Sequence, residues 1–169
     1  PVLCMSVLGK IPDVSKTITA DFKKTNSTVC LIGKTDDSLG GSVYYQVNGL
    51  EGDSVPRVDL KVLPKTFGAI YKGIQNGKIL ACHDVSEGGV IGAIFEMCVG
   101  GNCGASIKAG DDELLLETTG CFIVEVENEE VAKKLFKGVP FKISGKITKD
   151  EKLKVENLFT VDIKKLQQA

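Results

Sequence analysis

The stretch Ile79–Gly101 constrains the fold most strongly, because it joins two apolar runs of different period through a glycine turn. The first run, Ile79–Cys82, is short and continuous, which predicts a buried β-strand. After the Gly88-Gly89 pair, apolar side chains recur every three or four residues, which predicts a helix with one apolar face. Gly100-Gly101 then supplies a helix stop. The sequence therefore predicts a strand, a turn and a helix in succession.

The turn between this strand and this helix carries a first candidate binding site. Asp84 and Ser86 are residue types that cap helix N-termini, and glycines at a helix start let an anion approach free backbone N–H groups. We therefore predict that Asp84, Ser86, Gly88 and Gly89 contact a nucleotide or another anion. The alternative is structural: the glycines allow the helix to pack closely on the sheet, and the polar residues only cap the helix.

His83 is the only histidine, and it lies directly after the predicted strand, where a general base can sit. It is therefore included among the candidate nucleotide- or anion-binding residues. No cysteine or serine partner stands at motif spacing, so the alternative is a hydrogen-bonded structural histidine. No catalytic residue and no metal ligand is predicted in the chain.

A second glycine loop, residues 33–42, follows a predicted strand at Thr28–Ile32. Its Gly33-Lys34-Thr35 triplet matches part of a nucleotide-binding P-loop, but that motif requires glycine at position 28, where threonine stands. A P-loop is therefore excluded. The turn formed by Gly40, Gly41 and Ser42 remains a candidate anion nest, with Lys34 nearby. The alternative is a flexible turn with solvated charges.

The remaining segments predict a layered α/β domain of the α+β type. Helices are expected over residues 58–76, from an Asn128 cap to Phe136, and over residues 159–168. The first of these either starts at Pro64, with proline in its first turn, or is kinked there. Further strands are expected at residues 2–11, 16–20, 105–107, 114–116, 121–126, 141–148 and 152–156. Hairpin-like neighbours favour a mixed, largely antiparallel sheet with packed helices over a doubly wound parallel sheet. No repeat or linker divides the chain, so residues 1–169 are expected to form a single domain.

Composition argues against several classes of protein. Apolar residues make up 43% and charged residues 25%, which is ordinary for a globular domain, and a net charge of -1 gives no electrostatic reason to expect nucleic acid. No apolar stretch approaches the roughly 18 residues that a membrane-spanning helix requires, and no leader is recognised. The six cysteines form no C-x-x-C pair and mostly lie in apolar runs, so we expect reduced thiols in a cytoplasmic protein.

Three segments together resemble a known family. They are Gly33–Tyr45 (GKTDDSLGGSVYY), Leu80–Gly104 (LACHDVSEGGVIGAIFEMCVGGNCG) and Leu114–Val126 (LLLETTGCFIVEV). In this order and spacing the chain resembles phosphoribosylformylglycinamidine synthase, in particular the C-terminal domain of the second of its two homologous halves. That domain belongs to the superfamily of aminoimidazole ribonucleotide synthetase. HDVSEGG followed by a helix and GNCG is the most specific part of the resemblance.

The resemblance implies that the chain is a fragment of an ATP-dependent ligase of purine biosynthesis. This enzyme converts formylglycinamide ribonucleotide to its amidine with ammonia from glutamine. ATP and magnesium are then cofactors of the parent enzyme, and its partners are the other domains of the synthase and a glutaminase domain or subunit. In this family the catalytic histidine and the magnesium ligands lie in the N-terminal domains, so the fragment alone is expected to be inactive.

One departure from the family bears on the role of this domain. The family's first half carries a substrate-contacting serine–glutamine–glutamate signature where this chain has Glu117-Thr118-Thr119-Gly120-Cys121. The difference favours a non-catalytic half that supports the active half across an interface. Two alternatives stay open: an assembly or nucleotide-pocket module without catalysis, or another reaction of the superfamily, such as those of selenophosphate synthetase, thiamine-phosphate kinase or hydrogenase maturation.

Overall fold

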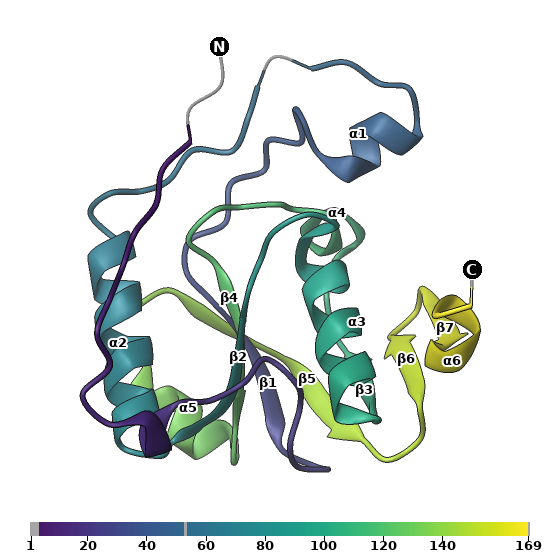
Figure 1. The fold of residues 1–169 in the computed structure, drawn as a ribbon. Helices are drawn as coiled ribbons and strands as arrows, with labels where there is room; N and C mark the ends of the chain where they lie inside the picture. The colour runs from purple at the N-terminus through teal and green to yellow at the C-terminus, as the bar shows by residue number, and fades with distance from the viewer. Residues whose placement is uncertain (1–3, 53, 169) are drawn as a thin grey trace.

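The computed structural model describes residues 4–52 and 54–168, in which seven strands form one sheet (Figure 1). The strand order is β2-β4-β1-β5-β3-β6-β7, and every pairing is antiparallel except that of β3 with β6. This confirms the predicted mixed, largely antiparallel sheet. The strands are β1 (Thr28–Ile32), β2 (Ile79–Asp84), β3 (Gly104–Ile107), β4 (Phe122–Val126), β5 (Phe141–Thr148), β6 (Lys152–Val155) and β7 (Phe159–Asp162).

Helices cover both faces of the sheet. Helices α2 (Leu63–Gln75) and α5 (Glu129–Leu135) lie on one face, and α3 (Gly89–Gly101) lies on the other (Figure 1). Strand β1 shows how the sequence specifies this arrangement, because successive side chains of a strand point to opposite faces. Val29 and Leu31 pack with the α3 side of the core, whereas Cys30 and Ile32 pack with the α2 and α5 side. A strand buried on both faces is expected to be largely apolar, and in TVCLI the four residues after Thr28 are apolar.

The helix boundaries follow from local signals. Pro64 lies in the first turn of α2, which decides for a helix start there over a kink, and the Asn128 side chain accepts the Val131 N–H at 3.0 Å to cap α5. Three shorter helices are α1 (Val43–Val47), α4 (Asp111–Leu114) and α6 (Ile163–Leu166), and residues Val14–Lys16 form a 3-10 turn. Along the described chain, none of the helices combines the length and apolarity needed to cross a membrane.

Two strand predictions near the N-terminus are wrong. Residues 2 and 3 of the first lie outside the described residues, and residues 4–11 form no strand. Residues 16–20 also form no strand, and the 3-10 turn overlaps their start. A strand requires a neighbour for its N–H and C=O groups, and neither segment pairs with the sheet.

Two predictions in the second half are also wrong. Residues 114–116 form no strand, because α4 ends at Leu114 and the chain then runs irregularly, with Leu114 and Leu116 buried. Periodicity alone cannot assign such a short apolar run. The helix predicted over residues 159–168 is replaced by β7 and the short α6. A tight turn at Asn157, with φ of 63°, brings β7 back against β6.

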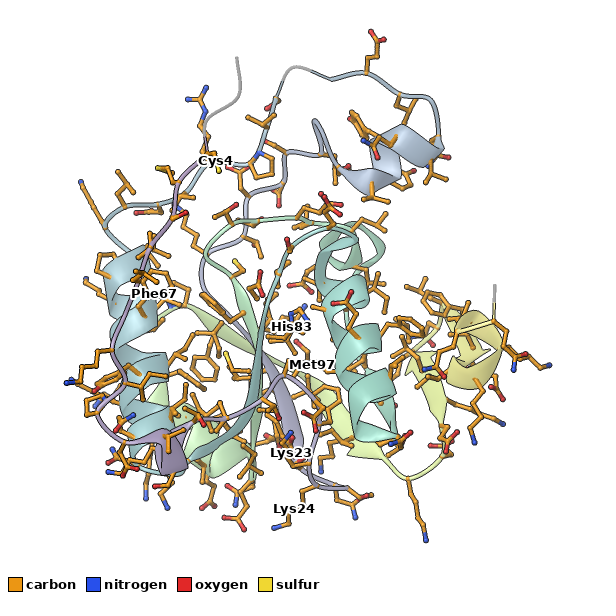
Figure 2. All side chains as sticks on the ribbon, in the orientation of Figure 1. Cys4, Lys23, Lys24, Phe67, His83 and Met97 are labelled. Atoms are coloured by element: carbon orange, nitrogen blue, oxygen red, sulfur yellow. The ribbon has the colours of Figure 1, made fainter. Side chains whose placement is uncertain are left out.

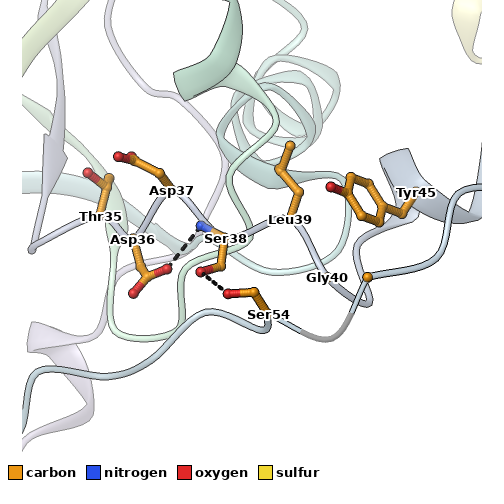
Figure 3. A pocket seen from close by; sticks show the side chains of 9 residues that line it. Thr35, Asp36, Asp37, Ser38, Leu39, Gly40, Tyr45 and Ser54 are labelled. Atoms are coloured by element: carbon orange, nitrogen blue, oxygen red, sulfur yellow. Dashed lines mark hydrogen bonds between the residues drawn. The ribbon is translucent and has the colours of Figure 1, made fainter.

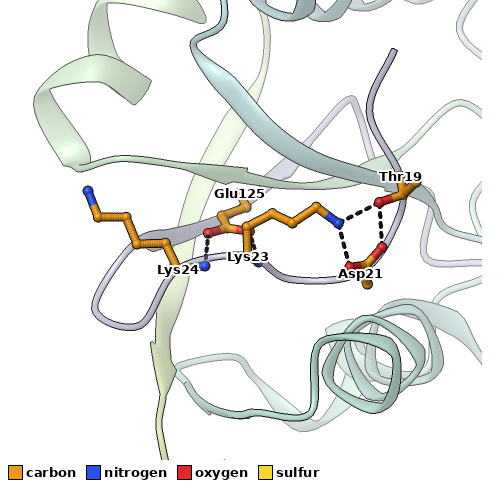
Figure 4. A network of polar contacts seen from close by, with 5 residues as sticks. All are labelled: Thr19, Asp21, Lys23, Lys24 and Glu125. Carbon is orange, nitrogen blue, oxygen red and sulfur yellow. Dashed lines mark hydrogen bonds and ion pairs between the residues drawn. The ribbon is translucent and has the colours of Figure 1, made fainter. Parts of the chain in front are cut away.

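The loop before β1 is fixed by a buried carboxylate on β4. Glu125 accepts the backbone N–H groups of Lys23 and Lys24 at 2.7 and 2.9 Å (Figure 4). It also accepts the hydroxyl of Ser27 at 2.7 Å. The Lys23 ammonium continues this polar cluster to Asp21 at 2.5 Å. A buried carboxylate is tolerated where several donors satisfy it, and here they tie the start of β1 to the centre of the sheet.

All six cysteines are free thiols. Four are buried, at positions 30, 98, 103 and 121, and Cys4 is exposed. Burial raises the pKa of Cys30 to about 12 and that of Cys121 to about 11, because the thiolate is poorly solvated in the core. These buried thiols are therefore small apolar core residues.

Candidate functional site

Three loops meet at one end of the sheet, and Glu117 joins them. The loops are residues 33–42 after β1, residues 85–88 between β2 and α3, and residues 115–121 before β4. Oε1 of the Glu117 carboxylate accepts the N–H of Val43 at 2.9 Å and the N–H of Gly88 at 2.9 Å. The two glycine-bearing bends therefore meet at a single oxygen atom.

Further hydrogen bonds hold the same loops together. The Thr118 hydroxyl, which is buried, accepts the N–H of Asp36 at 3.0 Å and lies 3.2 Å from the Asp36 carbonyl oxygen. The N–H of Val85 donates to the Cys121 carbonyl at 2.9 Å. The 115–121 loop is therefore a brace between the other two.

The start of α3 is built on two glycines in the left-handed region. Gly88 has φ of +81° and Gly89 has φ of +69°, and a Cβ added at Gly89 would lie 2.7 Å from the carbonyl carbon of Leu115. Gly88 is the N-cap residue, without a side-chain cap hydrogen bond, so the predicted capping by Asp84 or Ser86 is wrong. The carboxylate at the positive end of this helix is that of Glu117.

The other bend is also held by close backbone contacts. The N–H of Gly40 donates to the Ser54 carbonyl at 2.9 Å, and a Cβ at Gly40 would lie 2.4 Å from that oxygen. Gly41 has φ of +78°, and the Ser42 hydroxyl accepts the Tyr45 N–H at 3.3 Å to cap α1. The roles visible here for Gly40, Gly41 and Ser42 are thus turn formation and helix capping.

A cavity of about 620 Å³ lies beside this bend (Figure 3). Hydroxyl and carboxylate groups are prominent in its lining. The Asp36 carboxylate accepts the Ser38 N–H at 3.0 Å. The Ser38 side chain, and after it this backbone N–H, lower the pKa of Asp36. The lining residues are Thr35, Asp36, Asp37, Ser38, Leu39, Gly40, Tyr45, Gly52 and Ser54.

A second cavity, of about 400 Å³, opens between α2 and the turn after β2. Its apolar wall includes Phe67 and Phe122, whose rings meet edge to face at 5.7 Å, and three carboxylates line its polar part. No basic side chain lines it among the residues that the structure describes. The lining residues are Leu63, Phe67, Asp84, Val85, Ser86, Glu87, Glu117, Thr119, Gly120 and Phe122.

Lys34 and His83 line neither of these cavities. The Lys34 ammonium lies 3.0 Å from the Asp59 carboxylate, and this ion pair lowers the pKa of Asp59. His83 lies between β2 and α3 (Figure 2). It links the two, because its Nε2 lies 2.9 Å from the Glu96 carboxylate and its Nδ1 lies 2.7 Å from the Asp84 carbonyl oxygen. These contacts favour the structural interpretation of His83.

The structure thus brings the two predicted bends together but does not give them a common cavity. Gly40 lines the first cavity, whereas Asp84 and Ser86 line the second. Glu117 lies between the bends and binds amides from both. Ligand contact by the nine candidate residues remains a prediction.

Comparison with known proteins identifies the domain. Residues 24–156 match the model of the family described as AIR synthase related protein, C-terminal domain. The chain belongs to this family. Over its whole length, this AIR synthase-related domain is 35% identical, across 181 aligned residues, to phosphoribosylformylglycinamidine synthase subunit PurL of Rhodopseudomonas palustris strain TIE-1. It is 36% identical over 117 residues to PurL of Picrophilus torridus, covering 69% of this chain and 16% of the relative.

The AIR synthase-related domain spans only about a quarter of the length of the R. palustris relative, 24%. Solved structures share its fold at low sequence identity. Thermotoga maritima PurL complexed with FGAR superposes with a TM-score of 0.74 at 16% identity, over 90% of this chain and 30% of that one. Escherichia coli HypE, a hydrogenase maturation protein, superposes with a TM-score of 0.59 at 16% identity, over 85% of this chain and 50% of that one. At such identities the likeness establishes a common fold.

Around the Glu117 carboxylate, the residues that the structure describes do not suit a phosphate or magnesium. The Val43 and Gly88 amides, which would suit a phosphate, are bound by the Glu117 carboxylate. Asp84 and Glu87 add negative charge around the second cavity. Within residues 4–52 and 54–168, no group of three or more metal-ligating side chains is placed to hold an ion. A bare triphosphate would meet repulsion here, so no chemical step is assigned to this end of the domain.

Proposed function

We propose that this domain is part of a phosphoribosylformylglycinamidine synthase, the ATP-dependent ligase that converts formylglycinamide ribonucleotide to its amidine in purine biosynthesis. The observation that carries the proposal is the 35% identity with R. palustris PurL across the whole chain. Residues 1–169 would form a single domain of a longer cytoplasmic protein. A glutaminase domain or subunit would supply ammonia.

ATP and magnesium would bind in parts of the synthase outside this chain. T. maritima PurL, which shares this fold with a TM-score of 0.65, has been solved complexed with ATP, and this supports nucleotide binding by the parent enzyme. The role proposed for this domain is structural support. The loops braced by Glu117 and the carboxylate-lined cavity would form a fixed surface for the catalytic part of the synthase.

A segment replacement tests the proposal. Residues 1–169 would replace the corresponding quarter of R. palustris PurL, and the chimera would be expressed in a strain that lacks PurL. We expect growth without added purine. The same chimera with Gly89→Val is the control, because the new side chain would collide with the Leu115 backbone, and we expect no growth. A chimera that is soluble and assembles, yet does not restore growth, would contradict the proposal.

The isolated chain gives a second test. With ATP, magnesium, ammonia and formylglycinamide ribonucleotide, we expect no amidine, and its formation would contradict the supporting role. Calorimetric titration with Mg-ATP is expected to give no binding heat. A heat that disappears with Ser86→Ala or Gly41→Val, but not with Glu130→Gln on α5, would instead assign a nucleotide to the two bends.

A further inference from the structure

Residues 4–11, CMSVLGKI, are an apolar segment that the domain leaves uncovered. The side chains of Met5, Val7, Leu8 and Ile11 are 78%, 91%, 100% and 60% exposed. Figure 1 shows the segment as an extended trace that runs past α2, with Cys4 labelled on it in Figure 2. Contiguous apolar groups at such exposure mark a surface that another structure covers.

The backbone of this segment is also without partners. Among the described residues, no hydrogen bond joins a backbone group of residues 4–12 to another residue. The composition is nevertheless that of a strand, because apolar residues occupy both alternating faces, which is typical of a strand covered on both sides. The sequence therefore specifies a strand whose neighbour is missing from this domain.

The family model does not include this segment, whereas the alignment with a synthase relative does. The family model begins at residue 24, whereas the alignment with R. palustris PurL covers 100% of this chain. The structure gives a matching boundary at Phe22, which is buried and donates its N–H to the Met97 carbonyl at 3.0 Å. Ile18 also packs against the core, so the packed domain begins near residues 18–22, and residues 4–11 lie beyond it.

We propose that residues 4–11 form a β-strand that pairs with a sheet edge in the remainder of the parent synthase. This inference rests on the proposed function, which makes the domain part of a longer chain. Pairing would satisfy the free N–H and C=O groups, and a sheet covered on both faces would bury Met5, Val7 and Leu8. Pro12 cannot donate to a ladder, and the Asp13 carboxylate caps the following 3-10 turn by accepting the Ser15 N–H at 3.0 Å. The strand would therefore end at Ile11.

Amide hydrogen exchange read by mass spectrometry tests the pairing. We would compare the 169-residue chain with the complete synthase chain that contains it. We expect residues 4–11 to exchange at least about 100-fold more slowly in the complete chain, whereas β1 exchanges alike in both. Equally fast exchange of residues 4–11 in both proteins overturns the inference. A second outcome also overturns it: residues 4–11 exchange slowly in the isolated chain, the rate depends on protein concentration, and the chain has the mass of a dimer. The partner of the strand would then be a second copy of this chain.

Matched valine variants give an independent measurement. Val7→Asp is expected to leave the Tm of the 169-residue chain unchanged and to lower that of the complete chain by at least about 3 °C. Val14→Asp is the control, because Val14 is 78% exposed but lies outside the segment, and we expect no change in either protein. An unchanged Tm of the complete chain with Val7→Asp overturns the pairing. A complete chain that shows slowed exchange without synthase activity would contradict the proposed function alone.

Discussion

Replacement of Glu117 by alanine should loosen the end of the sheet where the three loops meet. The carboxylate accepts two backbone N–H bonds at 2.9 Å, and a hydrogen bond to a charged group contributes about 1.5–3 kcal/mol. Because Glu117 is only half-buried, we take the lower value for each bond and expect a loss of about 3 kcal/mol. Glu117→Gln keeps an oxygen acceptor without the charge. Since neutral bonds are about half as strong, we expect a loss of about 1.5 kcal/mol.

Urea unfolding followed by far-ultraviolet circular dichroism measures these losses, since the chain contains no tryptophan. Glu87→Ala is the matched control. Glu87 lines the same cavity, is exposed, and makes no side-chain hydrogen bond to another described residue, so its loss should stay within about 0.5 kcal/mol. Amide exchange adds a local measurement: Val43 and Gly88 should exchange faster in Glu117→Ala than in the wild type.

Two results would refute this reasoning about Glu117. One is a Glu117→Ala variant that loses no more stability than Glu87→Ala. The other is unchanged exchange at both Val43 and Gly88, which would mean that other contacts hold the bends. If only one amide exchanges faster, the carboxylate braces a single loop, and the expected loss falls to about 1.5 kcal/mol.

Three further predictions concern the core and its boundaries. Gly89→Ala places a side chain on a residue with φ of +69°, with its Cβ 2.7 Å from a backbone carbon. Urea unfolding should therefore show that the free energy of unfolding falls by about 2–4 kcal/mol. Gly68→Ala lies in α2 with open space around the added Cβ, so the free energy of unfolding should rise by about 0.5–1 kcal/mol. Glu125→Gln weakens three bonds to a buried carboxylate and should cost about 2–4 kcal/mol in the same assay. With iodoacetamide at pH 8, mass spectrometry should find Cys4 alkylated and Cys30 spared. Burial raises the folded-state pKa of Cys30 from 9.0 to about 12. The contribution of Cys30 to the free energy of unfolding is therefore present below pH 9 and is lost as the pH rises toward 12. In Cys30→Ala, the free energy of unfolding should fall less steeply with pH over this range.

The elements that the sequence predicted correctly are those whose burial or capping is local. Residues 29–32 of β1 are all apolar because the strand is buried on both faces, and Asn128 precedes two glutamates at the start of α5. Helix α3 has its period and its glycine boundaries within one stretch. Helix α1 was missed, although Ser42 is a capping residue type, because five residues give too short a pattern to recognise.

The wrong predictions concern segments whose state depends on distant partners. Residues 159–162 form a strand because β6 offers them an edge, whereas residues 4–11 have strand composition but no edge within the domain. Leu114 and Leu116 are buried in the core although residues 114–116 pair with no strand. An apolar composition indicates that a segment favours burial. Whether that segment becomes a strand depends on pairing with a neighbouring strand.

The candidate site shows the same dependence on distant contacts. Glu117 lies 74 positions from Val43 and 29 positions from Gly88 in the sequence, and no local pattern around Glu117 predicts that its carboxylate binds both amides. The glycine bends correctly located the amide donors. The glycine pattern did not indicate which acceptor binds these N–H groups in the folded chain.

That acceptor determines the chemistry which this end of the domain can offer. Half-buried amides require an acceptor, and the fold supplies one from its own 115–121 loop, so a phosphate would first have to displace Glu117. It would then meet Asp84 and Glu87 as like charges around the same cavity. A cationic group avoids both costs, because it can bind the carboxylates without breaking the brace. The surface is therefore suited to a basic side chain, which agrees with the proposed supporting role of the domain.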